Sequence, residues 1–138
     1  MNTRRVAIVL ASLAAVAIMG ITCFNFFCAA QQLVYKTISV SDARAMIQSS
    51  SNLMLVDVRT PGEYAQGHLK GAINIPLSDL PLRIGELEQN RPILVYCRTG
   101  YRSAQASSIL VKAGFTQVYN LEGGIIAWIN AGYPTVTP

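Results

Sequence analysis

Cys97 is the residue of this 138-residue chain that is best placed to do chemistry. It directly follows the apolar run 93–96 (ILVY), and the polar run 98–103 (RTGYRS) then leads into a helical pattern. A crossover from strand to helix gathers backbone N–H groups that have no partner within the helix, and such a nest binds anions. Arg98 and Arg102 add two positive charges. We therefore expect Cys97 to be a thiolate at neutral pH, the form of cysteine that acts as a nucleophile.

A purely structural role for Cys97 is the competing interpretation, because free cysteine is among the residue types most often buried. Cys97 would then end a buried strand, and Arg98 and Arg102 would be solvated loop charges. The other two cysteines, Cys23 and Cys28, are not spaced as a C-x-x-C redox pair, and we interpret them as apolar fillers. If they are removed with the segment that holds them, Cys97 has no partner for an internal disulfide.

The first thirty residues have the pattern of an export segment. Arg4 and Arg5 precede an uncharged stretch, 6–24, and the small residues Ala29 and Ala30 suit a signal peptidase that cleaves before Gln31. The alternative is an uncleaved N-terminal hydrophobic helix that anchors the chain, because 19 residues at 1.5 Å each span about 28 Å of a bilayer. Either way, we expect the chain after Gln31 to lie across the membrane from the cytoplasm.

The composition supports a single folded domain over residues 31–138. Hydrophobic residues make up 51% of the chain and charged residues 13%, against roughly 25% charged in soluble domains, and the N-terminal segment accounts for this difference. After Gln31, nine Lys and Arg stand against seven Asp and Glu. No stripe of basic residues interleaved with aromatics is present, which argues against nucleic-acid binding. About 150 residues per domain leaves no room for a second catalytic domain.

Alternating strands and helices must position the Cys97 loop. Apolar runs predict strands at 35–40, 53–58, 72–75, 93–96 and 118–121, and the fully apolar ones suit a parallel sheet covered on both faces. One helix is expected to begin with Ser41 as its N-cap and to run through Ile47, and others are expected over 77–88, 103–113 and 125–130. Gly114 suits the end of the helix at 103–113. This order predicts an α/β fold with a mostly parallel sheet, whose ligand sites lie beyond the carboxyl ends of the strands.

Four stretches of the chain together resemble the rhodanese family in its single-domain form. They are 57–64 (DVRTPGEY), 67–76 (GHLKGAINIP), 97–103 (CRTGYRS) and 121–128 (LEGGIIAW), and the resemblance covers the chain from about Tyr35 onward. It implies a three-layer α/β/α domain and a thiosulfate sulfurtransferase in which Cys97 takes a sulfane sulfur as a persulfide and passes it to cyanide or a thiol. An export segment on one such domain is similar to the small periplasmic sulfurtransferases of bacteria.

The same resemblance assigns roles to the loop residues. Cys97 is the expected nucleophile, and a small anionic sulfur donor is expected to bind to the residues of the loop, which are Arg98, Thr99, Gly100, Tyr101, Arg102 and Ser103. Loop amides and arginines suit such an anion chemically. Asp57 and Arg59 could pair and support the sheet edge beside the loop. No metal or organic cofactor is implied, and membrane contact is expected only if the N-terminal helix stays uncleaved.

Other features of the sequence have simpler interpretations. His68 is the only histidine, and we interpret it as a hydrogen-bonded turn residue and not as a base. Trp128 is expected to pack in the core. Gly123 and Gly124 are expected to form a turn, because a dinucleotide fingerprint needs a third spaced glycine.

Two rival functions remain open at this point. Cysteine phosphatases and arsenate reductases use a Cys-x5-Arg loop, but here Arg102 comes one position early, so a tetrahedral phosphate should fit poorly. A membrane-tethered module that binds a partner or carries a persulfide without turnover is the second rival.

Overall fold

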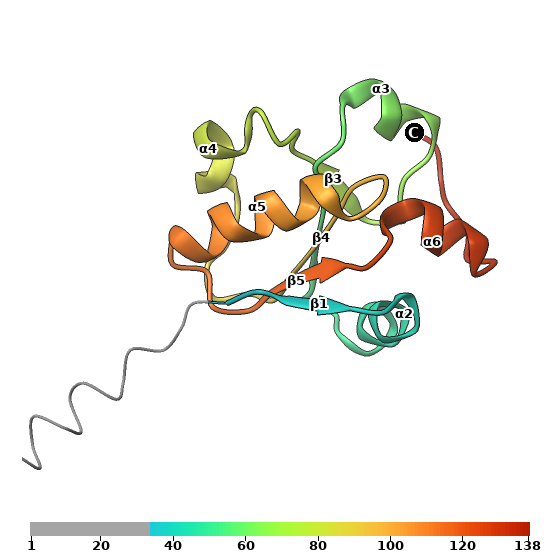
Figure 1. Cartoon of the computed structure of the whole chain (residues 1–138), viewed down its shortest axis with the longest axis horizontal. Coiled ribbons are helices and arrows are strands. Elements are labelled where there is room, and N and C mark those ends of the chain that lie inside the picture. Colours follow the sequence, from blue (N-terminus) through green and yellow to red (C-terminus); the bar gives the residue numbers. More distant parts are fainter. Residues whose placement is uncertain (1–33) are drawn as a thin grey trace, which may run out of the picture. The chain divides into compact units, whose positions relative to one another are not determined.

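The computed structural model describes residues 34–138, in which short strands and helices alternate (Figure 1). The strands are β1 (Lys36–Ile38), β2 (Met54–Asp57), β3 (Ala72–Asn74), β4 (Ile93–Tyr96) and β5 (Val118–Leu121). The helices are α2 (Val40–Ser49), α3 (Pro61–Gln66), α4 (Leu80–Arg83), α5 (Tyr101–Lys112) and α6 (Gly124–Asn130), and the 3-10 turn η1 (Ile84–Glu86) follows α4.

The five strands form one sheet in the order β1-β5-β4-β2-β3, and every neighbouring pair is parallel. Parallel neighbours require crossover connections, which the helices supply. Strand β4 lies at the centre, with β5 on one side and β2 on the other. The carboxyl ends of all five strands therefore meet at one edge of the sheet, and the loop that begins at Cys97 lies at its middle.

Apolar cores on both faces of the sheet make the domain three-layered. Side chains alternate along β4: Ile93 and Val95 pack in the core that includes residues of α4 and α5, whereas Leu94 and Tyr96 pack in the core that includes residues of α2 and α6. All four side chains of β4 are buried. Figure 1 shows α5 and α2 on opposite sides of the sheet. The predicted α/β fold with a parallel central sheet is confirmed.

The structure corrects several predicted elements. Ser39, not Ser41, caps α2, because the Ser39 hydroxyl accepts a hydrogen bond from Asp42 N–H at 3.2 Å. The helix predicted over 77–88 shortens to α4 and η1, because the chain first turns at Pro76, whose carbonyl accepts from the N–H groups of Asp79 and Leu80. Helix α3 was not predicted at all. Strands β4 and β5 have the predicted bounds, and Gly114 follows α5 with a φ of 99° as expected.

The predictions made for the first thirty residues lie outside the described part of the chain. They comprise the export segment, its cleavage before Gln31, and the interpretation of Cys23 and Cys28. Between residues 34 and 138, no helix is both long enough and apolar enough to cross a membrane.

Candidate active site

The loop after β4 wraps around the sulfur of Cys97. Gly100 adopts the left-handed conformation, with a φ of 98°, and helix α5 begins directly after it. This turn lets the N–H of Gly100 point back and donate to Cys97 Sγ over 3.1 Å. The Ser103 hydroxyl, in the first turn of α5, lies 3.5 Å from the same sulfur and 3.1 Å from the Gly100 carbonyl. The predicted nest of donors is therefore present.

The electrostatic environment of Cys97 favours its ionised form. Only 1% of the residue is exposed, and this burial would raise the pKa of the thiol. The Ser103 hydroxyl and the N–H groups of Ser103, Thr99 and Gly100 outweigh the burial and hold the pKa of Cys97 below its ordinary value. The direction agrees with the expectation from sequence. The main donors, however, are a hydroxyl and loop amides, whereas the sequence argument also relied on Arg98 and Arg102.

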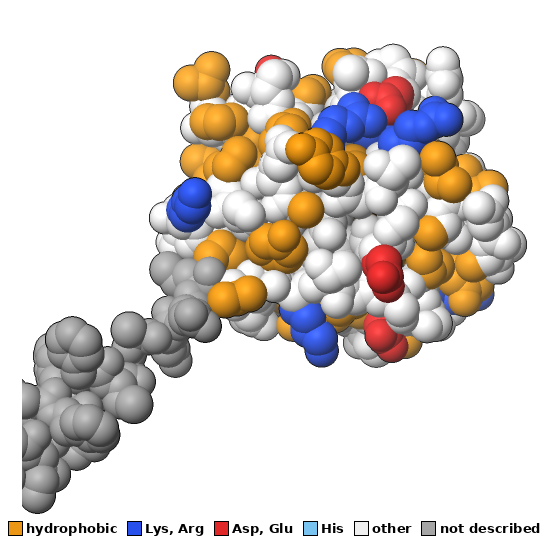
Figure 2. Space-filling model, viewed as in Figure 1, with side chains coloured by type: hydrophobic (Ala, Val, Ile, Leu, Met, Phe, Trp, Pro, Cys, Tyr) orange, Lys and Arg blue, Asp and Glu red, His pale blue; other side chains and the backbone are white. Residues whose placement is uncertain are grey.

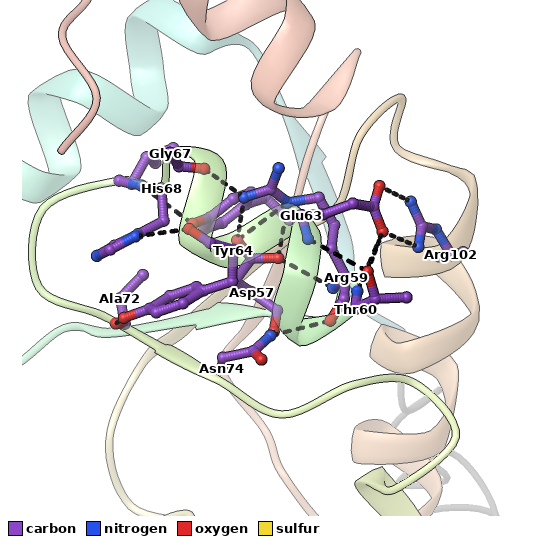
Figure 3. Close-up of polar contacts among 12 residues, drawn as sticks. Asp57, Arg59, Thr60, Glu63, Tyr64, Gly67, His68, Ala72, Asn74 and Arg102 are labelled. Carbon is purple, nitrogen blue, oxygen red and sulfur yellow. Dashed lines mark hydrogen bonds and ion pairs between the residues drawn. The ribbon is translucent and has the colours of Figure 1, made fainter. Parts of the chain in front are cut away.

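The Arg102 side chain is paired with the carboxylate of Glu63, to which the sequence analysis assigned no role. Its two terminal nitrogens donate to the two carboxylate oxygens of Glu63, over 2.8 and 2.9 Å, in a two-pronged ion pair (Figure 3). The pair joins α3 to the first turn of α5. Because Glu63 neutralises much of the Arg102 charge, Arg102 supports the thiolate less than a free guanidinium would.

The position of Glu63 follows from the way α3 begins. Thr60 caps the helix: its hydroxyl accepts from Glu63 N–H at 3.3 Å, and Glu63 Oε2 accepts from Thr60 N–H at 3.1 Å. Hydrogen bonds from Arg102, which outweigh the effect of burial, and from Thr60 lower the pKa of Glu63 from 4.5 to about 2. The spacing Thr-x-x-Glu at 60–63 is the signature of this capping box and could have revealed both α3 and its fixed carboxylate.

Helix α6 holds the backbone of the loop from the other side. The N–H groups of Ile125 and Ile126 donate to the carbonyls of Cys97 and Arg98, over 2.9 and 3.2 Å. Gly124, with a φ of 60°, lies so close that an added Cβ would be 2.5 Å from both of those carbonyl oxygens. Gly124 therefore forms more than the predicted turn: it lets α6 fix the two peptide groups that follow the nucleophile.

Asp57 and Arg59 form the predicted pair at the end of β2. Both side chains are buried, and Arg59 Nε lies 2.9 and 3.0 Å from the two carboxylate oxygens of Asp57. Arg59 also donates to the Gly67 carbonyl at 2.7 Å, and Asn74 donates to the backbone carbonyls of both Asp57 and Arg59 (Figure 3). These bonds fasten the segment that leads into α3, so they support Glu63 indirectly.

The remaining predicted residues divide into exposed and structural ones. Arg98 and Thr99 are exposed on the loop, and Tyr101 is exposed at the start of α5. His68 is buried, stacks on the Tyr64 ring with 3.7 Å between centroids, and has Nδ1 3.0 Å from the Tyr64 carbonyl, as a turn residue would. Trp128 is part of the core, as expected. Among residues 34–138, no cluster of side chains is suited to bind a metal ion.

A parallel α/β/α domain with a cysteine in an anion-binding loop at the carboxyl edge of its sheet is the class of protein that this geometry defines. Residues 39–131 match the family model described as Rhodanese-like domain. The chain therefore belongs to the rhodanese-like family.

Individual relatives agree with this assignment. The chain is 42% identical over 92 residues to a protein of Allochromatium vinosum named sulfurtransferase, a match that covers 67% of this chain and 86% of the relative. It is 35% identical to the thiosulfate sulfurtransferase GlpE of Shewanella oneidensis, over 70% of this chain and 95% of the relative. The crystal structure of a rhodanese-related protein from Thermoplasma volcanium is 36% identical, has a TM-score of 0.70, and matches 75% of this chain and 100% of that one.

Proposed function

We propose that this protein is a thiosulfate sulfurtransferase that works through a persulfide on Cys97. The observation that carries the proposal is the set of donors around Cys97 Sγ: Gly100 N–H at 3.1 Å and the Ser103 hydroxyl at 3.5 Å, in a loop whose N–H groups lower the pKa of the thiol. Relatives named sulfurtransferase and thiosulfate sulfurtransferase support the same chemistry.

The first half-reaction loads sulfur onto the protein. The Cys97 thiolate attacks the outer sulfur of thiosulfate, a sulfur–sulfur bond forms to Sγ, and sulfite leaves with the electron pair of the bond that breaks. The persulfide carries one negative charge, which the same amide donors can stabilise. Arg98 is exposed beside Cys97 and would attract the dianionic donor.

The second half-reaction releases that sulfur. Cyanide or a thiolate attacks the outer sulfur of the persulfide, thiocyanate or a new persulfide forms, and the bond electrons return to Cys97 as its thiolate. The donors that lower the pKa of Cys97 also make it a better leaving group. No metal or organic cofactor takes part in either step.

Turnover by the purified protein tests the proposal. We expect thiocyanate to form from thiosulfate and cyanide, and intact mass to show one added sulfur atom after thiosulfate alone. Cys97→Ser should abolish both results. A mass gain without turnover would favour the persulfide carrier. If folded protein shows no mass gain and no turnover, the proposal is refuted.

The position of Arg102 favours sulfur transfer over phosphate chemistry. The loop has four residues between Cys97 and Arg102, and the guanidinium is bound to Glu63 through both terminal nitrogens. The arginine that would have to bind a phosphate ester is therefore already occupied, so we expect no hydrolysis of aryl phosphates.

We further propose that the domain works outside the cytoplasm, most simply in a bacterial periplasm. The proposal rests on Arg4 and Arg5, the uncharged run 6–24 and the small residues before Gln31. Intact mass of the protein recovered from the exported fraction tests it. A mass that begins at Gln31 would indicate cleavage, a full-length mass in membranes would indicate an anchor, and recovery only from the cytoplasm would refute export.

A further inference from the structure

A cleft of about 290 Å³ lies between α3 and α6, beside the Cys97 loop. Its lining includes Gln66 from the end of α3, Arg98 from the loop, Thr135 from the C-terminal tail, and three isoleucines of α6, Ile125, Ile126 and Ile129. This volume is just below the roughly 300–1,000 Å³ range of small-molecule sites. The cleft can therefore hold a small organic molecule.

One wall of the cleft is apolar and open to solvent. Ile126 and Ile129 lie one turn apart on α6 and are 36% and 52% exposed. Exposing aliphatic carbon to water is unfavourable by about 0.8 kcal/mol per CH₂ group. Figure 2 shows hydrophobic side chains close to Lys and Arg side chains on the face that carries α6 and the start of α5. A ligand with a short alkyl chain would cover this wall.

The charge that the cleft offers to a ligand is positive. Of the charged groups in its lining, Arg59 is paired with Asp57, and Glu63 is paired with Arg102. Arg98 makes no ion pair with any residue in the described part of the chain. A ligand with a carboxylate could therefore bind Arg98 without displacing an existing partner.

The cleft begins next to the proposed nucleophile. Arg98 directly follows Cys97, and Ile125, another lining residue, donates its N–H to the Cys97 carbonyl over 2.9 Å. A molecule held by Arg98 and the isoleucine wall would thus lie against the backbone of the loop that carries Cys97. Inorganic donors have no alkyl group to use this wall, whereas an organic acceptor thiol does.

We propose that the α3–α6 cleft is the binding site for the sulfur acceptor, a small aliphatic thiol that carries a carboxylate. Arg98 binds the carboxylate, the alkyl chain covers Ile126 and Ile129, and the thiolate attacks the outer sulfur of the Cys97 persulfide. The proposal rests on the proposed function for its reaction, but binding in the cleft can be measured without any reaction.

Binding is tested first, with a probe that cannot react. Purified Cys97→Ser protein, with its isoleucine methyl groups labelled for NMR, is titrated with hexanoate and separately with hexylammonium. We expect hexanoate to shift the Ile126 and Ile129 methyl signals and hexylammonium to leave them in place. Ile73, which is exposed on β3, is the control signal and should not move. Equal responses to both probes, or no response at Ile126 and Ile129, would overturn the proposal.

Transfer is tested second, in single turnovers from protein already loaded with sulfur, so that the donor takes no part. The ratio of the transfer rate to 6-mercaptohexanoate over the rate to cyanide should fall on the order of tenfold in the double variant Ile126→Ser, Ile129→Ser, because two aliphatic contacts are lost. Arg98→Gln should slow transfer to 6-mercaptohexanoate more than transfer to hexanethiol. Ile73→Ser is the matched control and should leave the ratio unchanged.

The two tests separate failure of the cleft from failure of the sulfurtransferase. If sulfur-loaded wild type and double variant have the same ratio of transfer rates to 6-mercaptohexanoate and to cyanide, the cleft is not the acceptor site. The proposed function would remain intact. Protein that never loads sulfur would refute the proposed function, while the hexanoate titration would still decide whether the cleft binds a carboxylate.

Discussion

At the scale of single residues, neutral donors that the fold holds in place lower the pKa of Cys97 despite its burial. Gly100 N–H and the Ser103 hydroxyl point at the sulfur, whereas Arg102, the arginine of α5, is bound to Glu63. Neutral dipoles at contact distance are much less affected by dissolved salt than charges at the surface are. The reactivity of Cys97 should therefore depend only weakly on ionic strength.

Alanine substitutions of Ser103 and Ser107 test whether the Ser103 hydroxyl lowers the pKa of Cys97. Ser103→Ala removes a donor to the thiolate, so the pKa of Cys97 should rise and alkylation at neutral pH should slow by about threefold to tenfold. Ser107 lies one turn further along α5, and its buried hydroxyl has no hydrogen-bond partner. Ser107→Ala should leave the alkylation profile unchanged and should not lower stability. Identical profiles for the two variants would show that the Ser103 hydroxyl is not a significant donor.

The ion pair between Arg102 and Glu63 predicts opposite effects for its two members. Arg102→Ala leaves an uncompensated carboxylate near the loop, so the pKa of Cys97 should rise and thiosulfate should bind more weakly. Glu63→Gln frees the guanidinium, so the pKa of the thiol should fall. The pH dependence of alkylation measures both changes. Shifts in the same direction would mean that these variants act by distorting the loop and not through their charges.

At the scale of elements, the two elements that flank the loop in sequence and one more distant helix define its shape. Cys97 directly follows strand β4, and the hydrogen-bond donors to its sulfur lie at the start of α5. Helix α6 fixes the carbonyls of Cys97 and Arg98. The close approach of α6 is possible because Gly124 has no side chain. A residue without reactive groups is therefore as important for the geometry of the site as the residues that face the sulfur.

Substitution of Gly124 and of Gly132 by alanine distinguishes the cost of backbone strain from the effect of displacing the Cys97 loop. Both have positive φ, 60° and 79°, but an added Cβ would meet the loop carbonyls only at Gly124, and Gly132 faces open space. Gly132→Ala should cost about 1–2 kcal/mol of stability for the left-handed backbone alone and leave alkylation unchanged. Gly124→Ala should cost more and raise the pKa of Cys97. Chemical denaturation and alkylation measure the two effects, and normal reactivity in folded Gly124→Ala would contradict this role.

At the scale of the whole molecule, the sequence predicted what depends on neighbouring residues and missed what depends on distant ones. Strands β4 and β5 were placed correctly because their apolar runs are bounded by turn residues. Asp57 and Arg59, two positions apart, could be paired from the sequence. Helix α3 was missed because Pro61 and Gly62 resemble a break, although Pro is well suited to the first turn of a helix.

The contacts that complete the site could not be read from local patterns. Glu63 and Arg102 are 39 residues apart, and Ile125 lies 28 positions after Cys97, whose carbonyl it binds. Only the order of strands in the sheet brings these residues together. The anion-binding loop could therefore be predicted from its own residues, whereas the elements that hold it in shape, and the cleft beside it, could not.

The stability of the folded chain should depend on pH through Glu63. The pKa of this carboxyl falls from 4.5 to about 2 on folding, so its ion pair stabilises the fold fully above about pH 4.5 and is lost as the pH falls toward 2. Both side chains are partly exposed, which limits the contribution to ~1 kcal/mol. Denaturation of wild type and Glu63→Gln should differ by this amount at pH 6 and converge near pH 2. Glu122→Gln controls for the loss of one surface charge, and a difference that persists at pH 2 would contradict the assignment.

The depth of Cys97 determines which of two sulfur atoms an incoming thiol can attack. With 1% of the residue exposed, Sγ is shielded, but a second sulfur bonded to it would extend about 2 Å outward. Attack on the inner atom would expel hydrosulfide and leave the protein trapped as a mixed disulfide, whereas attack on the outer atom regenerates free enzyme. Shielding of Sγ would therefore protect the proposed sulfurtransferase from being trapped as a mixed disulfide by its own acceptor.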